Sequence, residues 1–187
     1  MNYDKIISNS NGNLKKQTKI LVQRSPDDDG NNGKYYQSTL SVMINNDVNL
    51  YSAPVQSTAD HPNLNNGEAK YAGGTLEAGI YDGVLLNKSG SYNNAIIITG
   101  NGTEEKDAVL INPDVFTAKG ETQSYSQYGK PYSLACQIQE LDNFEKTINN
   151  LSNLGFKGGN PTTKNESWCK GDHIRIEIKD APDKKGK

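Results

Sequence analysis

The segment from His173 to Lys179 alternates without interruption between apolar and polar residues, a pattern that only a β-strand can turn into one buried face. Isoleucine stands at positions 174, 176 and 178, and charged residues stand between them. We therefore predict a half-buried strand, with the isoleucines facing a core and His173 facing solvent.

Short apolar and β-branched runs recur along the rest of the chain. Segments rich in Asn, Gly and Ser separate them, which is typical of a β-rich protein with many turns. Further strands are predicted over residues 19–24, 34–45, 47–52, 75–86, 95–99 and 108–112. Pro113 is expected to end the last of these, because proline cannot donate to a sheet ladder.

One helix is predicted, over residues 142–154. Its apolar residues recur at helical spacing, at Leu141, Phe144, Ile148 and Leu151. Asp142 and Glu145 have the spacing of a capping box, and Gly155 is expected to end the helix.

Length and composition set the limits. The 187 residues suit one domain, predicted over 17–180, with a loose polar arm at 1–16 and a disordered, solvated tail at 181–187. A net charge of -2 and a pI of about 5.7 argue against nucleic acid or an anionic membrane as partners. Only 33% of the residues are hydrophobic and the mean hydropathy is -0.78, so we expect long polar loops around a modest core.

No run approaches the roughly 20 apolar residues of a membrane span. The first residues carry no basic or apolar region typical of a signal peptide. Cytoplasmic retention, another export route and a trimmed signal therefore all stay open.

Cys136 is the candidate reactive group. It follows a Ser-x-small element and is either a buried core thiol or a pocket nucleophile. With Cys169 it forms a disulfide, a pair of buried thiols, or a reactive thiol and a bystander. A nucleophilic thiol needs a partner that lowers its pKa, and nothing in the spacing brings His61 or His173 to it.

The order of elements from about Gly74 to Ile178 resembles the L,D-transpeptidase-like catalytic domain and its small relatives in phage and secretion-linked cell-wall proteins. The resemblance rests on a Gly-x-Tyr strand start at 78–81, a strand at 109–112 whose end would carry the family's His, the Ser-Leu-Ala-Cys stretch at 133–136 in the place of the family's Ser-x-Gly-Cys element, the helix, and a Gly-initiated last strand. It covers a little over half of the chain.

The resemblance implies a mainly β fold, an L,D-transpeptidase-like β-sandwich or barrel with one principal helix. We expect the N-terminal strands, up to about Tyr51, to complete its sheet. It also implies that Cys136 is the nucleophile, that Ser133 shapes the pocket, and that backbone N–H groups near Ala135 and Cys136 hold an oxyanion.

Two positions depart from the family pattern. Ala135 replaces the family's Gly, and Asn112 replaces its His. An asparagine can orient a group or form hydrogen bonds, but it cannot act as a general base near neutral pH.

The residues near Cys136 are candidates for binding. Tyr128 and Tyr132 end the long connection 114–132, which has the length of a lid or binding loop, and Gln137 follows the thiol. The tyrosines either stack on sugars or anchor the loop.

Two functions follow. The first is a degenerate module that binds a cell-wall fragment or a protein partner, for instance in a phage particle or a secretion apparatus. The second is a cysteine acyl transferase or hydrolase acting on peptidoglycan stem peptides. We favour the first because the base is lost. The resemblance favours the cell envelope or a secreted assembly, and a cytoplasmic location stays open.

No cofactor is expected. The acidic turn at 27–29 offers oxygen ligands that suit calcium, but it lacks the distal Glu of an EF-hand loop. We interpret it as a solvated turn, so no metal is predicted.

Overall fold

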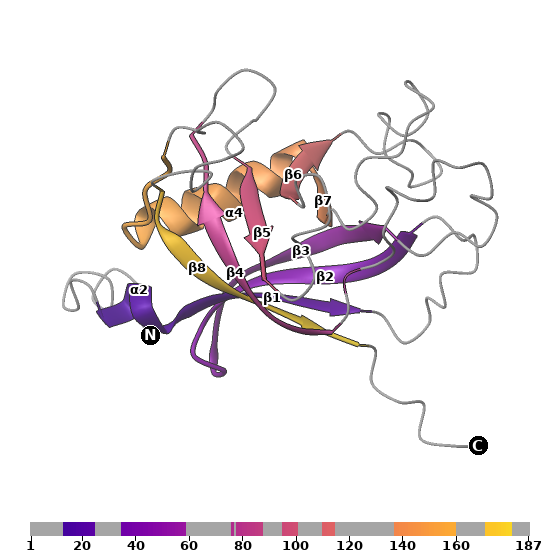
Figure 1. Cartoon of the computed structure of the whole chain (residues 1–187), viewed down its shortest axis with the longest axis horizontal. Coiled ribbons are helices and arrows are strands. Elements are labelled where there is room, and N and C mark those ends of the chain that lie inside the picture. Colours follow the sequence, from indigo (N-terminus) through magenta and orange to yellow (C-terminus); the bar gives the residue numbers. More distant parts are fainter. Residues whose placement is uncertain are drawn as a thin grey trace.

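The computed structural model describes residues 13–24, 35–58, 76, 78–87, 95–100, 110–114, 137–159 and 171–180. In these ranges the chain is mainly β, as predicted, with one principal helix (Figure 1). The strands are β1 (Thr18–Arg24), β2 (Tyr35–Ile44), β3 (Val48–Thr58), β4 (Gly79–Leu85), β5 (Ile96–Thr99), β6 (Leu110–Asp114), β7 (Gln137–Glu140) and β8 (His173–Lys179). The helices are α2 (Asn13–Gln17) and α4 (Leu141–Asn153).

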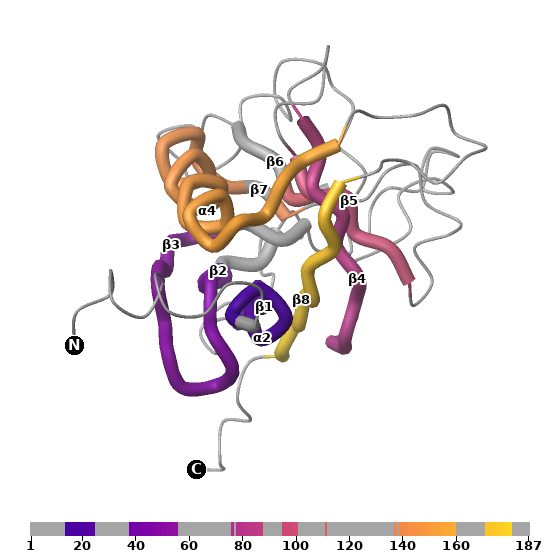
Figure 2. The backbone as a smooth tube through the Cα atoms, turned by 90° about the vertical axis from the view of Figure 1, so that its left-hand side faces the viewer, coloured from indigo at the N-terminus to yellow at the C-terminus, as the bar shows by residue number. Residues whose placement is uncertain are grey.

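The described strands close into a barrel in the order β1-β2-β3-β7-β6-β5-β4-β8. Figure 2 shows them arranged around a ring, with α4 beside β3 and β7. Closure depends on β8, which pairs in parallel with β1 and antiparallel with β4. The N-terminal strands therefore belong to the same sheet as the C-terminal strand, as expected from the sequence.

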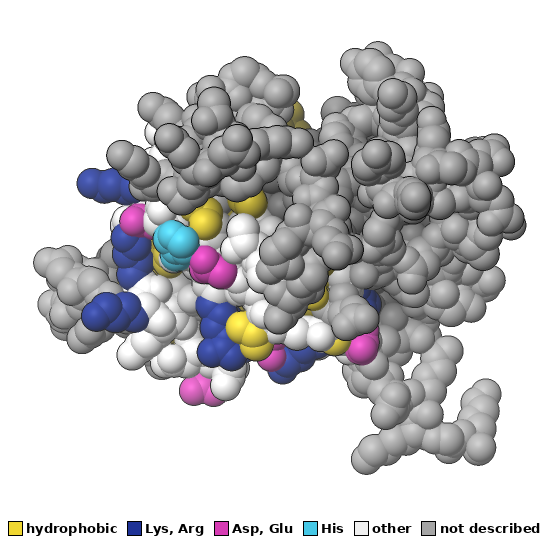
Figure 3. Space-filling view, viewed as in Figure 1, with side chains coloured by type: hydrophobic (Ala, Val, Ile, Leu, Met, Phe, Trp, Pro, Cys, Tyr) yellow, Lys and Arg dark blue, Asp and Glu magenta, His cyan; other side chains and the backbone are white. Residues whose placement is uncertain are grey.

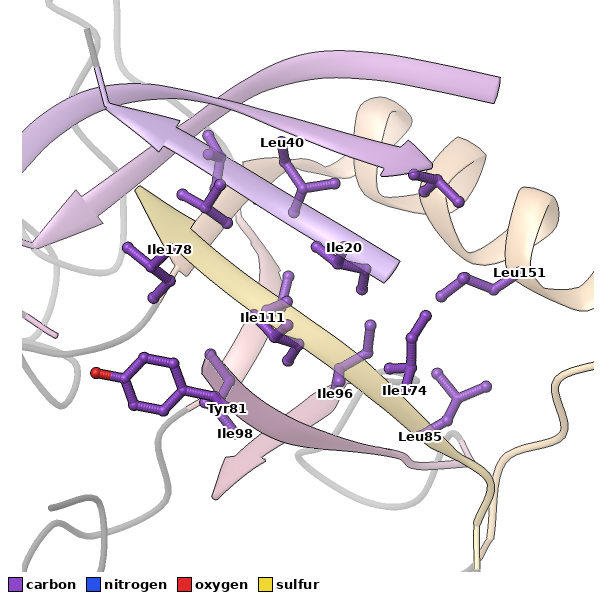
Figure 4. Close-up of a cluster of buried hydrophobic side chains, with 14 of the residues drawn as sticks. Ile20, Leu40, Tyr81, Leu85, Ile96, Ile98, Ile111, Leu151, Ile174 and Ile178 are labelled. Carbon is purple, nitrogen blue, oxygen red and sulfur yellow. The ribbon is translucent and has the colours of Figure 1, made fainter. Parts of the chain in front are cut away.

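The interior is aliphatic because alternate residues of almost every strand point inward (Figure 4). Fully buried side chains come from β1, β2, β5, β6 and β8, and they include Ile20, Leu40, Ile96, Ile111 and Ile176. The strand predicted at 173–179 has the same bounds in the structure, with its isoleucines buried and His173 exposed.

Helix α4 packs its apolar face against this core through Phe144 and Leu151. Its C-terminus forms a Schellman motif: Gly155 N–H donates to Ser152 O at 2.9 Å, and Phe156 N–H donates to Leu151 O at 3.1 Å. The φ of Gly155 is 92°, a left-handed conformation that favours glycine, so the predicted stop at this residue is confirmed.

The N-terminal end of α4 differs from the prediction. The helix begins at Leu141 and Glu140 occupies the N-cap position without a side-chain cap, so the capping box from Asp142 to Glu145 is wrong. The reason is that β7 runs straight into α4 and leaves no loop for a cap. Leu141, predicted on the apolar face, is 43% exposed because the helix starts there, beyond its contact with the core.

Proline residues are accommodated inside two strands. The prediction that Pro113 ends its strand is wrong, since β6 continues to Asp114 and Pro113 pairs with Gln139 of β7. On the other side, β5 pairs only with Leu110 and Ile111, so the missing N–H of Pro113 breaks no ladder there. The strand predicted at 47–52 likewise runs on through Pro54 to Thr58.

At the end of the predicted polar arm, residues 13–17 form the short helix α2. None of the helices in the described ranges is both long and apolar enough to cross a lipid bilayer.

Candidate functional site

The strand that follows Cys136 and the strand that contains Asn112 are direct neighbours. β6 and β7 run parallel, with Ile111 opposite Gln137 and Asn112 opposite Ile138. On its other side, β7 pairs with β3, where Ser57 lies opposite Gln137. Two residues 25 positions apart in the chain, Asn112 and Gln137, thus belong to adjacent strands of the barrel wall.

Most of the residues predicted to form the site lie outside the described ranges. These are Cys136, Ser133, Ala135, Tyr128 and Tyr132, together with His61, Cys169 and the acidic turn at 27–29. Asn112 is described through its backbone, in the middle of β6, and Gln137 is the first residue of β7. The thiol–amide contact implied by the resemblance therefore stays a prediction.

Strand β7 turns two amide side chains inward, and polar side chains of β1 and β2, among them Thr18, Arg24 and Ser38, are buried as well. Gln137 and Gln139 alternate along the strand, and both are fully buried. In the neighbouring strands, Ile111 of β6, which lies opposite Gln137, and Val55 of β3 are buried aliphatic residues. A buried amide requires hydrogen-bond partners, because an unpaired one loses about 1–3 kcal/mol of solvation.

Gln139 is satisfied only in part. Its Oε1 accepts a hydrogen bond of 2.8 Å from the hydroxyl of Thr147 on α4. Its Nε2 has no hydrogen-bond partner among the residues that the structure describes. Within the described ranges the side chain thus presents a buried donor without a partner, two positions after Gln137 and three after Cys136 in the sequence.

Helix α4 fixes β7 and β3 in place around these amides. The Asn143 carbonyl lies 3.1 Å from the Thr147 hydroxyl as a second acceptor for its single proton, and the Tyr51 hydroxyl of β3 donates to Asn143 Oδ1 at 3.2 Å. Burial raises the pKa of the Tyr51 hydroxyl, which keeps it protonated as a donor.

His173 is the histidine that the described ranges contain, and it lies far from β7. β8 is separated from β7 by three strands in either direction around the barrel, about four spacings or roughly 19 Å along the wall. Its Nδ1 lies 2.6 Å from Asp82 Oδ2 on the outer surface, where the histidine side chain is 64% exposed. Figure 3 shows this histidine beside an acidic side chain.

The residues that sequence reasoning missed are Gln139 and Thr147. Polar residues on a strand usually face solvent, so a Gln-x-Gln pattern predicts an outward face. These positions are interior because α4, which directly follows β7, packs over this strand and places Thr147 against Gln139.

Comparison with known proteins returns no match, whether to protein-family models, to curated proteins or to solved structures.

Proposed function

We propose that this chain is a binding module, L,D-transpeptidase-like in layout, that holds a cell-wall peptide at the β6–β7 end of its barrel without cleaving it. The observation that carries the proposal is the position of His173. His173 lies on the outer face of β8 and is hydrogen-bonded to Asp82 of β4. Strand β8 is on the opposite side of the barrel from β7, the strand that Cys136 precedes in the sequence.

A thiol that lacks a general base is a poor catalyst. Loss of a general base typically lowers a rate by about 10²–10⁴. The family position for that base holds Asn112, and the histidine that the described residues include is engaged elsewhere. The same arrangement leaves binding intact, because binding requires donors and acceptors rather than proton transfer.

The buried amides of β7 support a binding role. Peptide ligands offer carbonyl and carboxylate oxygens, and Nε2 of Gln139, which has no partner within the part of the chain that the structure describes, is a donor for such groups. Gln137, at the start of the same strand, joins this polar interior to the segment that contains Cys136, Ala135 and Ser133. The two buried amides of β7 lie on the strand that directly follows Cys136, and the ligand is placed beside this strand.

The parallel pairing of β6 and β7 also suits the second hypothesis, a cysteine acyl transferase or hydrolase. In that mechanism the Cys136 thiolate attacks a stem-peptide carbonyl, a thioester forms, and the amine leaves with the thiol proton. Water or a second amine then cleaves the thioester and restores the thiol.

One experiment separates the two functions. The chain and its Cys136→Ala variant are each titrated with a soluble muropeptide by calorimetry, and the mixtures are analysed by mass spectrometry. We expect both proteins to bind with the same affinity and neither to form product. Product, or an acyl adduct on the wild-type chain that is absent from Cys136→Ala, would establish the enzyme. Absence of binding to both proteins would refute a cell-wall ligand.

A further inference from the structure

A polar groove of about 450 Å³ lies on the outer wall of the barrel, away from β7. It follows β1 between β8 and β2 and extends to the turn between β2 and β3. Residues from α2 complete it at one end. The lining residues that carry the argument are Lys16, Lys19, Leu21, Arg175, Glu177 and Lys179.

The groove concentrates positive charge. It contains four cations (Lys16, Lys19, Arg175 and Lys179) and one carboxylate (Glu177), a local balance of +3 on a chain whose net charge is -2. Charge of one sign gathered in a concave surface attracts the opposite charge more strongly than scattered charges do. In Figure 3, lysine and arginine side chains gather below the histidine.

The strand register places these charges in rows. Lys19 of β1 lies between Arg175 of β8 and Met43 of β2. In the next outward row, Leu21 lies opposite Glu177. Lys179 stands two residues further along β8, so Arg175 and Lys179 are about 13 Å apart on one face.

The single carboxylate is already neutralised inside the groove. Lys19 Nζ lies 2.5 Å from Glu177 Oε2 and 2.7 Å from Asn46 Oδ1, and Lys179 Nζ lies 3.7 Å from Glu177 Oε1. The hydrogen bond from Lys19 holds the pKa of Glu177 below its ordinary value, so this carboxylate stays ionised. Arg175 and Lys16 form no ion pair with any residue in the described ranges, and they are the cations most available to a ligand.

We propose that this groove binds an extended acidic segment of a partner protein. Two acidic side chains four residues apart on an extended peptide are also about 13 Å apart, which matches the separation of Arg175 and Lys179. This surface is independent of the β6–β7 site, and the proposal does not rest on the cell-wall function.

The centre of the groove favours a peptide over a polymer with closely spaced anions. Glu177 lies between Arg175 and Lys179, so an anion at half their separation would face a carboxylate. A peptide places a neutral residue there, against the half-buried side chains of Leu21 and Met43. The amides of Asn45 and Asn46 provide donors and acceptors for its backbone.

The test uses a fluorescent peptide with glutamate at its first and fifth positions and Thr or Val between them, measured by anisotropy. The double variant Arg175→Gln/Lys179→Gln removes the two rim charges, and Lys146→Gln/Lys157→Gln removes two exposed charges outside the groove as a matched control. Exposed ion pairs are worth about 0.2–1 kcal/mol each, so the Kd should rise roughly 2- to 30-fold in the groove variant and stay constant in the control.

Two results would overturn the proposal. One is an equal loss of affinity in both double variants, because the attraction would then depend only on net charge. The other comes from a parallel titration with inorganic polyphosphate. If polyphosphate binds more tightly than the peptide and loses affinity in Arg175→Gln/Lys179→Gln, the groove is a phosphate-polymer site. Far-UV circular dichroism checks that each variant is folded.

Discussion

Replacing Gln139 by methionine should stabilise the protein, which is unusual for a substitution at a fully buried position. Gln139 is fully buried, its Oε1 accepts one hydrogen bond from Thr147, and its Nε2 has no partner within the described residues. Methionine has a similar length and shape and carries no amide to leave unsatisfied.

The magnitude follows from two opposed terms. Removing the buried unpaired donor recovers about 1–3 kcal/mol, and losing the bond to Thr147 removes about 0.5–1.5 kcal/mol. The Thr147 hydroxyl is not left alone in the variant, because its proton then goes to Asn143 O, which lies 3.1 Å away. The expected gain in the free energy of unfolding is therefore about 1 kcal/mol.

Urea unfolding followed by circular dichroism measures this gain. Thr147→Val is the matched variant: it leaves both ends of the Gln139 amide without a bond and should lower the free energy of unfolding by about 1–3 kcal/mol. In the double variant Gln139→Met/Thr147→Val most of that loss should disappear. If Gln139→Met instead destabilises the protein by more than about 1 kcal/mol, the amide has a partner and the reasoning is refuted.

A stabilising Gln139→Met would also bear on function. Proteins keep destabilising polar groups where activity requires them, so the variant should lose muropeptide affinity while it gains stability.

Three further predictions concern the scaffold. Gly83→Ala would place a methyl group 2.6 Å from Ile176 Cδ1 inside the barrel, and this overpacking should lower the free energy of unfolding by about 1–3 kcal/mol in urea. Gly155→Ala meets no atom within 4 Å but must adopt the φ of 92°, so it should lose about 1–2 kcal/mol, whereas Gly155→Asn should lose less. The hydrogen bond from Lys19 lowers the pKa of Glu177 in the folded protein. The ion pair therefore adds its full contribution to the free energy of unfolding above the unfolded-state pKa of about 4.3, and this contribution is lost as the pH falls below that pKa. A Tm profile from pH 7 to 3 should therefore flatten in Glu177→Gln, and an unchanged acid slope would contradict the assignment.

Local patterns predicted the elements well where they repeat over several residues. The alternation at 173–179 gave a strand with the observed bounds, and the spacing of Phe144 and Leu151 gave helix α4. Both predictions rest on the spacing of apolar residues along one face of the element, and a short stretch of sequence is enough to reveal that spacing.

Long-range arrangement could not be predicted in the same way. The parallel pairing of β1 with β8 joins Lys19 to Arg175 across most of the chain, and no local pattern encodes it. The tolerance of Pro113 depends on where β5 stops, and the inward direction of Gln139 depends on how α4 covers β7. The groove has the same origin, since its cations come from α2, β1 and β8.

The alkylation rate of the Cys136 thiol as a function of pH tests the central claim most directly. It is measured with iodoacetamide in a Cys169→Ser background, so that one thiol reacts. A module without a base should show an ordinary thiol pKa, near 8.5, and slow alkylation at pH 7, and Asn112→His should lower that pKa. A thiol that already reaches its full rate below pH 7 in the unchanged Asn112 protein would contradict the account, because an activating group would then lie beside Cys136.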